Sequence, residues 1–330
     1  MPDMQQSTAL DPAQIDAVRA LAAAATAADG VAPLSEETLL SLDRQPGPDG
    51  ETATYLSVRD GEDLAAYAQV ARDGSAEIVV HPEHRRRGYG RRLLDGVIGV
   101  RPDARVWAHG NVEGAQALAA SAGLQVVREL WKMTLDAEAH PTPEPVVPQG
   151  FSARAFVPGQ DEQAWLDVNA RAFAYHPEQG RMTLEDLQDR MQQSWFDPAG
   201  LILVEDTKGG ALAASHWTKV EAPEGAPGLD TPSASAPGYS AGGASAPSGS
   251  TSASGEVYVV AVDPAYQGHG LGKVVTALGL RHLQERGIHH IDLYVEGDNA
   301  PAVATYSRLG FERSALDVMY SRGVHEGLSR

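Results

Sequence analysis

The 330-residue sequence contains no cysteine, which excludes disulfide bonds, thiolate metal sites and a cysteine nucleophile. Basic residues are scarce: 26 Lys and Arg against 44 Asp and Glu give a net charge of −18. That balance argues against nucleic acid or an anionic membrane as the main partner. No stretch approaches the roughly 18 apolar residues of a membrane span. Asp11 and Asp16, rather than a basic segment, precede the apolar run 21–28, so we predict no signal peptide and a cytoplasmic protein.

The most informative stretch is a glycine-rich loop between a predicted strand and a predicted helix. It runs from Val260 to Lys273 and reads V-A-V-D-P-A-Y-Q-G-H-G-L-G-K. Glycines let the backbone approach a ligand closely, and the first N–H groups of a helix lack internal partners. Such a loop is typical of a phosphate site. Its spacing does not fit a P-loop and makes a Rossmann dinucleotide site a weak alternative.

The same arrangement occurs earlier in the chain, where Ile78–Val80 precedes Arg85–Gly90. Gly88 and Gly270 hold equivalent places, 182 residues apart. One repeat of this length indicates two domains of one fold. We expect a first domain over residues 1–138, a Pro-rich linker over 139–150 and a second domain over 151–330. Strands alternate with helices without strict βαβ regularity, so the predicted fold class is α/β with a mixed sheet.

Two compositional features stand out within this plan. Five arginines surround the first loop, which in an acidic chain indicates a site for a polyanionic small molecule: Arg85, Arg86, Arg87, Arg91 and Arg92. A solvated helix start is the alternative, although arginine at a helix N-terminus opposes the helix dipole. Residues 222–255 consist mainly of Ala, Ser, Gly, Pro and Thr. We predict a disordered insert there, between two neighbouring strands.

Candidate proton carriers for acyl transfer to an amine occur in the second half only. Glu256 opens the strand that leads into the loop, and period two predicts residues 256, 258, 260 and 262 on one face. Tyr306 lies four residues before Gly310. The equivalent first-half positions are Gly74 and Ala119. We predict Glu256 as general base and Tyr306 as general acid; a solvated carboxylate and a half-buried helix tyrosine are the alternatives.

The loop pattern Gln267-x-x-Gly270-x-Gly272 resembles the pyrophosphate loop of GNAT acetyltransferases. Further blocks together resemble the mycothiol synthases, a family of tandem GNAT enzymes: residues 30–36, His176–Gly180, Trp195–Pro198, 201–203, His216–Val220, Gly255–Val259 and Leu293–Asn299. The similarity covers the chain except residues 222–255, where that family has a short turn. It implies acetyl transfer from acetyl-CoA to the cysteinyl amine of cysteinyl-glucosaminyl-inositol, with catalysis in the second domain and a non-catalytic acetyl-CoA site in the first.

This resemblance also assigns residues. For the thiol-sugar substrate it implies Glu36, Glu178, Lys219, Glu256 and Tyr294. For acetyl-CoA in the first half it implies Ile78, Val79, Val80, Arg85, Arg86, Arg87, Gly88, Tyr89, Gly90 and Arg91. For acetyl-CoA in the second half it implies Val260, Ala261, Val262, Gln267, Gly268, His269, Gly270, Leu271, Gly272, Lys273 and Asn299.

Two other functions stay open at this point. One is a tandem GNAT enzyme for another small amine, such as an aminoglycoside or a peptide N-terminus. The other is a non-enzymatic acetyl-CoA sensor, against which Glu256 and Tyr306 argue. His269, His289 and His290 have no credible set of partner ligands, so we predict no metal. We further expect a monomer with a small-molecule substrate and without nucleic-acid or membrane partners.

Overall fold

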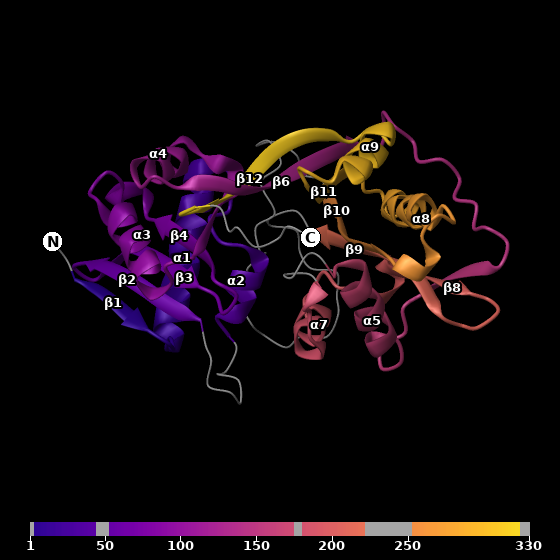
Figure 1. Cartoon of the computed structure of the whole chain (residues 1–330), viewed down its shortest axis with the longest axis horizontal. Coiled ribbons are helices and arrows are strands. Elements are labelled where there is room, and N and C mark those ends of the chain that lie inside the picture. The colour runs from indigo at the N-terminus through magenta and orange to yellow at the C-terminus, as the bar shows by residue number, and fades with distance from the viewer. Residues whose placement is uncertain (1–2, 44–52, 175–179, 222–252, 324–330) are drawn as a thin grey trace.

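The computed structural model describes residues 3–43, 53–174, 180–221 and 253–323. Across these residues, twelve strands form one mixed sheet in the order β1-β2-β3-β4-β5-β12-β6-β11-β10-β9-β8-β7. The first half of the chain occupies one end of the elongated molecule and the second half the other (Figure 1). The predicted α/β class with a mixed sheet is confirmed.

The first half carries the following described elements in chain order: β1 (Met4–Ser7), α1 (Pro12–Asp29), α2 (Glu36–Ser41), β2 (Thr54–Asp60), β3 (Asp63–Val70), β4 (Ser75–Val80), α3 (Tyr89–Val100), β5 (Arg105–Ala108), α4 (Glu113–Ser121) and β6 (Gln125–Asp136). The Pro-rich segment 139–150 that follows contains neither helix nor strand. The second half carries β7 (Phe151–Ala155), α5 (Glu162–Ala172), α7 (Leu184–Met191), β8 (Leu201–Asp206), β9 (Leu212–Glu221), β10 (Ser254–Val262), α8 (Leu271–Glu285), β11 (His290–Glu296), α9 (Ala300–Arg308) and β12 (Glu312–Ser321).

Helix α1 shows how local sequence sets the bounds of an element. Asp11 accepts a hydrogen bond from the Gln14 backbone N–H, and the Gln14 side chain accepts one from the Asp11 N–H, both at 2.8 Å. Pro12 occupies the first turn, and Gly30 ends the helix with φ +69°. This reciprocal cap satisfies two donors that a helix start leaves without partners.

Each half buries its sheet between helices on both faces. In the first half, α1 packs Val18 and Leu21 against Val79 on one face, while α3 packs Leu93 and Val97 on the other. In the second half, one face is covered by α5, whose Trp165 meets Trp217 with ring centres 5.3 Å apart. Helix α8 covers the opposite face through residues that include Val275 and Leu280. β4 therefore lies within the core of the first half, and β10 lies within the core of the second.

The last strand of each half crosses to the other half. β12 pairs with β5 and β6, while β6 pairs with β11 and β12. Both long strands span the middle of the molecule in Figure 1. This exchange was not predicted from the sequence, because alternation of apolar residues defines a strand but not its hydrogen-bonding partner. Backbone pairing therefore joins the halves into one continuous sheet.

One prediction about β10 is wrong. The β9–β10 ladder contains a bulge between Val257 and Val259, with Tyr258 as the extra residue. A bulge reverses the alternation of side chains beyond it. Tyr258 and Val259 accordingly pack with Trp217 on the α5 face, whereas Val260 and Val262 pack with α8. Residues 256 and 258 do not share a face with 260 and 262.

The boundary of the predicted insert also needs correction. β10 begins at Ser254, which pairs with Glu221 of β9, and Gly255 pairs with Val220. These two residues belong to the sheet, and the cross-strand hydrogen bonds explain why their small side chains do not prevent strand formation. Residues 222–252 of the predicted insert lie outside the described residues.

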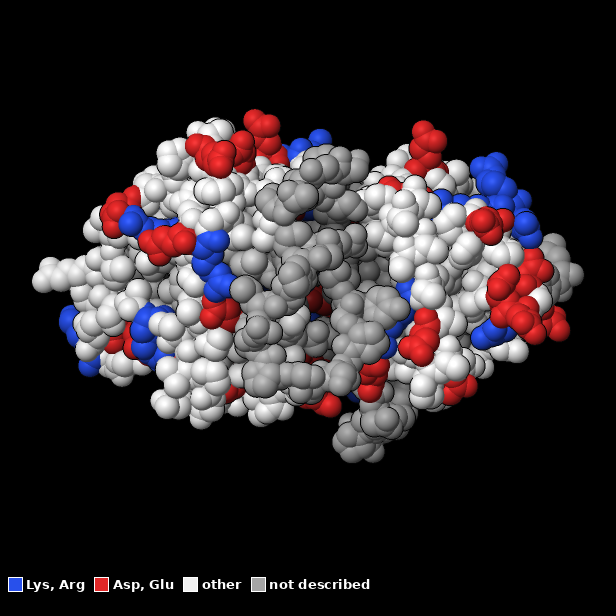
Figure 2. Space-filling model, turned by 180° about the vertical axis from the view of Figure 1, so that it is seen from behind, with Lys and Arg blue, Asp and Glu red and all other residues white. Residues whose placement is uncertain are grey.

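Surface charge agrees with the acidic composition. In Figure 2, acidic and basic side chains occur in small interspersed groups over both halves. No helix in the described residues is long and apolar enough to cross a membrane.

Candidate active site

The two glycine loops follow the same backbone course. Each strand leads into a short 3-10 turn, Pro82–His84 in the first half and Pro264–Tyr266 in the second. Gly88 and Gly270 then begin α3 and α8 with φ angles of 86° and 74°, and neither helix start has a side-chain cap. The first N–H groups of both helices can therefore bind an anion.

The loops differ two residues earlier. Gly268 has a φ of 82°, and the equivalent Arg86 adopts a φ of 62°. A non-glycine residue in that region carries a strain of order 1–3 kcal/mol. The first loop thus keeps the shape of the second although its sequence opposes that shape.

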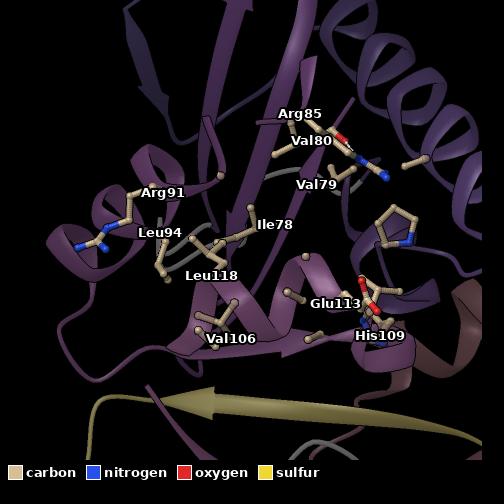
Figure 3. Close-up of a pocket in the computed structure, with 18 of the residues that line it drawn as sticks. Ile78, Val79, Val80, Arg85, Arg91, Leu94, Val106, His109, Glu113 and Leu118 are labelled. Carbon is tan, nitrogen blue, oxygen red and sulfur yellow. Dashed lines mark hydrogen bonds between the residues drawn. The ribbon is translucent and has the colours of Figure 1, made fainter. Parts of the chain in front are cut away.

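A cavity of about 670 Å³ lies beside the first loop, which is within the usual range for a small-molecule site. Its walls are largely apolar and include Ile78, Val106 and Leu118, while Arg85 and Arg91 lie on opposite sides of it (Figure 3). Of the first-half residues expected to bind acetyl-CoA, all except Arg87 line this cavity. The structure therefore brings that predicted set together.

The arginine cluster is less positive than its sequence indicates. Arg85 forms a two-pronged pair with Asp29 at 2.7 Å, and Arg87 lies 3.0 Å from Asp60. Arg91 pairs with Asp95 at 3.0 Å, and Arg92 lies 3.9 Å from Asp3. Arg86 is exposed and has no ion pair within the described residues. A polyanion at this site would meet the guanidinium of Arg86 and the N–H groups of the helix start. The other arginines of the cluster already pair with carboxylates, with which the polyanion would compete.

In the second half, strands β10 and β11 separate near the loop. Within the described strands they pair over three residues only, from Gly255 opposite Ile291 to Val257 opposite Leu293. Beyond this point β10 and β11 no longer pair, so Tyr258–Val262 have ladder partners on β9 only among the described strands. β4 and β5 of the first half also pair over three residues, from Ser75 opposite Arg105 to Glu77 opposite Trp107.

Glu256 lies at the paired end of β10, next to two charged side chains. Its direct neighbours are Lys219 on β9 and Asp292 on β11. Directly opposed residues point to the same face of a sheet. Glu256 thus lies between a cation and an anion, on the face of the sheet that α5 covers.

Lys219 is held by a residue from the first half. Its Nζ donates to Glu36 Oε1 at 3.0 Å, and the Tyr258 hydroxyl donates to Glu36 Oε2 at 3.1 Å. The Lys219 side chain is 4% exposed, and its ammonium lies 5.1 Å from the centre of the Trp195 ring. A buried cation requires such pairing. The predicted substrate residues Glu36 and Lys219 are therefore in contact.

Arg190 extends this network. Its Nε donates to the Tyr258 hydroxyl at 2.8 Å, and its guanidinium donates to Glu37 at 2.5 Å. Burial raises the pKa of Tyr258, so the phenol stays neutral and can donate to Glu36. Burial lowers the pKa of Arg190, but Tyr258 and Glu37 together raise it above its ordinary value. Neither Tyr258 nor Arg190 was predicted, because the bulge that positions Tyr258 leaves no local sequence signal.

The exchanged strand β6 adds a second buried cation to the same face. Lys132 Nζ lies 2.8 Å from Asp292, and Lys132 is the cross-strand neighbour of Tyr294. Asn299 caps α9 by accepting a hydrogen bond from the Ala302 N–H at 3.2 Å. Glu178 lies outside the described residues. Among those described, no three His, Asp or Glu side chains are grouped so as to hold a metal ion.

Tyr306 approaches from the other face of the sheet. It packs edge-on against Phe311 with ring centres 5.8 Å apart, in the cluster that includes Leu280 of α8. Burial raises the pKa of its phenol to about 12, so it is protonated throughout the neutral range. Glu256 and Tyr306 thus belong to opposite faces, next to the strands that diverge.

Comparison with known proteins decides the family. The model of the acetyltransferase (GNAT) family matches residues 23–123 and 170–311, which contain both glycine loops. A mycothiol acetyltransferase of Cellulomonas flavigena is 48% identical over 94% of this chain and 86% of its own length. One from Kytococcus sedentarius is 45% identical over 96% of both chains. The chain belongs to the mycothiol acetyltransferase branch of the GNAT family.

Solved GNAT structures share this fold. A tandem GNAT protein from the clavulanic acid biosynthesis pathway has a TM-score of 0.67 at 18% identity, over 99% of this chain and 100% of its own. A GCN5-related N-acetyltransferase from Sphaerobacter thermophilus has a TM-score of 0.61 at 24% identity, over 98% of both chains. As a GNAT member, the chain is an N-acetyltransferase of a family that uses acetyl-CoA.

Proposed function

We propose that this protein transfers the acetyl group of acetyl-CoA to the cysteinyl amine of cysteinyl-glucosaminyl-inositol, which gives mycothiol. The relatives from Cellulomonas flavigena and Kytococcus sedentarius are both named mycothiol acetyltransferase. The observation that supports it in the structure is the placement of Glu256 and Tyr306 on either side of the diverging strands. Acyl transfer needs a base for the amine and an acid for the departing sulfur, at different positions around the carbonyl carbon.

Glu256 is proposed as the general base and Tyr306 as the general acid. A cysteinyl α-amine has a pKa near 8, whereas lysine has one near 10.4, so deprotonation at pH 7 costs about 1 kcal/mol for the first and roughly 4.5 kcal/mol for the second. One carboxylate acting directly or through water is sufficient for the α-amine. The raised pKa of Tyr306 keeps a proton available for the thiolate.

The thiol-sugar is proposed to bind over the face that carries Glu36, Lys219, Glu256 and Tyr294, with Glu178 as a further contact. This face alternates cations and carboxylates, which suits a substrate that carries an ammonium and many hydroxyl groups. Acetyl-CoA is proposed to bind along Val260–Val262 and the loop Gln267–Lys273, with Asn299 near its arm. The helix start at Gly270 offers N–H groups to its pyrophosphate.

The first loop is proposed to bind a second acetyl-CoA without catalysis. Gly74, which lies 182 residues before Glu256 in the sequence, sits in a turn with φ 86°, and Ala119, the counterpart of Tyr306 before the first-half glycine, is buried. Neither position provides a proton carrier. We propose accordingly that the chain divides into a binding domain over 1–138, a linker over 139–150 and a catalytic domain over 151–330.

Mass spectrometry of purified protein with acetyl-CoA and cysteinyl-glucosaminyl-inositol tests the proposed reaction. We expect a product heavier by one acetyl group, attached to the cysteinyl nitrogen. An aminoglycoside and a peptide with a free N-terminus serve as competing amines. Faster acetylation of either, or binding of acetyl-CoA without any turnover, would contradict the proposal.

A further inference from the structure

A buried ion cluster joins three distant parts of the chain. His109 lies in the turn His109–Asn111 after β5, and its ring is hydrogen-bonded on both sides. Nδ1 lies 3.0 Å from Asp317 of β12, and Nε2 lies 3.0 Å from Glu77 of β4. The second oxygen of Asp317 accepts a hydrogen bond from the Gly110 N–H at 2.7 Å. The exchanged strand β12 therefore supplies one of the two carboxylates.

The geometry requires a charged imidazole. A neutral ring has one N–H and one bare nitrogen, and a bare nitrogen cannot donate to a carboxylate. Burial alone would lower the pKa of His109, but its bonds to Asp317 and Glu77 raise it to about 10. The protonated ring donates to both carboxylates, and His109 in turn lowers the pKa of Glu77 against the effect of burial.

Glu77 transmits this contact to helix α2. Its Oε2 accepts a hydrogen bond from the Ser35 N–H at 2.9 Å, and the Ser35 hydroxyl accepts one from the Thr38 N–H at 3.2 Å. Helix α2 has six residues, none of them buried. So short a helix has little stability of its own. Leu34 and Leu42 anchor the two ends of this segment in the core, and the bond between Ser35 and Glu77 fixes the direction of its first turn.

The first turn of α2 supplies both carboxylates that reach the second half. Glu36 bonds to Lys219 and Tyr258, and Glu37 bonds to Arg190. The hydrogen-bond path from His109 to Lys219 thus runs through Glu77, the Ser35 backbone and Glu36. It begins in the first half and ends beside Glu256.

We propose that His109 is a positioning residue for the proposed acetyl transfer. By holding Glu77, it fixes the start of α2 and so sets the orientation of Glu36 toward Lys219 and the amine substrate. The proposal rests on the function proposed above. It predicts that loss of His109 weakens use of the amine more than use of acetyl-CoA, because Val260–Val262 and α8 make no part of this path.

The first test is steady-state kinetics of His109→Gln. We expect KM for cysteinyl-glucosaminyl-inositol to rise about tenfold, a coupling within the range for groups in one hydrogen-bond network. KM for acetyl-CoA and kcat should stay within about twofold, by the usual tolerance for sites that share no partner. Arg105→Gln is the matched control, because it breaks the pair of Arg105 with Asp73 at 3.1 Å at the opposite end of β5. It should leave both KM values unchanged.

A double-mutant cycle with Glu36→Gln separates positioning from general stability. If His109 acts through Glu36, His109→Gln should add little to the amine KM of a protein that already carries Glu36→Gln. An equal rise in both backgrounds would overturn the proposal, as would a rise in both KM values in His109→Gln alone.

A direct structural readout completes the test. Hydrogen exchange of residues 35–42 should be faster in His109→Gln, whereas exchange in α8 should be unchanged. If that variant fails to fold, Asp317→Asn, which keeps the contact between His109 and Glu77, should show the same effects at smaller size. Unchanged exchange of α2 in a folded variant refutes the positioning role. Failure of the wild type to acetylate the thiol-sugar instead refutes the proposed function, and the exchange experiment still applies.

Discussion

The strands that enter the two glycine loops differ by a single irregularity. β10 carries a bulge at Tyr258, whereas β4 pairs with β3 in regular register from Ala76 to Val80. By register, Ala76 corresponds to Val257, and these two residues pack under α3 and α8 respectively. The extra residue Tyr258 has no counterpart in β4; it turns to the opposite face and bonds to Glu36. Two halves whose loops follow the same course thus differ in the side chains that the preceding strand presents. The strand before the loop, and not the loop alone, therefore distinguishes the half proposed as catalytic from the half proposed only to bind acetyl-CoA.

The most direct test of the difference between the two halves is to introduce the same carboxylate into each loop. Gly88→Glu and Gly270→Glu occupy equivalent positions, with open space around an added Cβ in each. Gly270→Glu should abolish turnover, since a carboxylate would repel the pyrophosphate. Gly88→Glu should leave turnover per folded molecule largely intact and remove the share of acetyl-CoA stabilisation that comes from the first site, about 2.7 kcal/mol at a hundredfold excess over its Kd.

Thermal unfolding with and without acetyl-CoA, together with turnover, measures both effects. Gly61→Glu controls for backbone strain, since Gly61 also has a positive φ and open surroundings. A folded Gly88→Glu protein without any acetyl transfer would show that the first site is catalytic.

The second prediction concerns the proton carriers that the first half lacks. Tyr306→Phe should lower turnover by roughly 10²-fold or more, the usual scale of general acid–base catalysis. Glu256→Gln should lower it most near neutral pH and partly recover at high pH, where the amine is already neutral. Tyr55→Phe, a change to a buried first-half phenol, should have no effect on turnover. Full activity of the Glu256→Gln, Tyr306→Phe double variant would exclude both roles.

His109 in the first half and His216 in the second should make the free energy of unfolding depend on pH in opposite directions. The pKa of His109 is raised to about 10, so its stabilisation is complete below its unfolded pKa of about 6.5 and is lost as pH rises toward 10. Burial lowers the pKa of His216 to about 4, so its contribution is present above about 6.5 and is lost as pH falls toward 4. The free energy of unfolding should therefore decrease on both sides of neutrality.

Denaturant unfolding near pH 5, 7 and 9 measures this dependence. His109→Gln should flatten the alkaline side only, and His216→Gln the acidic side only. If His109→Gln still lost unfolding free energy at alkaline pH, groups other than His109 would be responsible for that loss.

The smallest effect is expected from the predicted insert. Replacing residues 223–252 with a short Gly-Ser turn should leave turnover and unfolding free energy nearly unchanged. Glu221 and Ser254 already pair across β9 and β10, and long surface insertions contribute little to stability. A loss of several kcal/mol, measured by denaturant unfolding, would show that the segment packs against the protein.

Local signals in the sequence predicted the elements that depend on neighbours in the chain. Asp11, Gln14 and Gly30 give the bounds of α1, and the repeated loop gives the starts of α3 and α8. The bulge at Tyr258 and the exchange of β6 with β12 could not be predicted in this way. Both depend on which strand lies alongside, and so on contacts between residues far apart in the chain. The partners of Glu36 could not be inferred from the residues for the same reason.

The exchange of β12 also constrains the order in which the chain can fold during synthesis. Asp317 follows His109 by 208 residues, a stretch that takes about 10 to 40 s to make at the usual rates of translation. Until β12 emerges, β5 has an unpaired edge, and such edges tend to recruit other strands. The first half completes its sheet only when the last strand of the second half arrives. Long-range pairing of this kind makes folding slow, so the open edge of β5 is the part of the nascent chain most exposed to pairing with neighbouring chains.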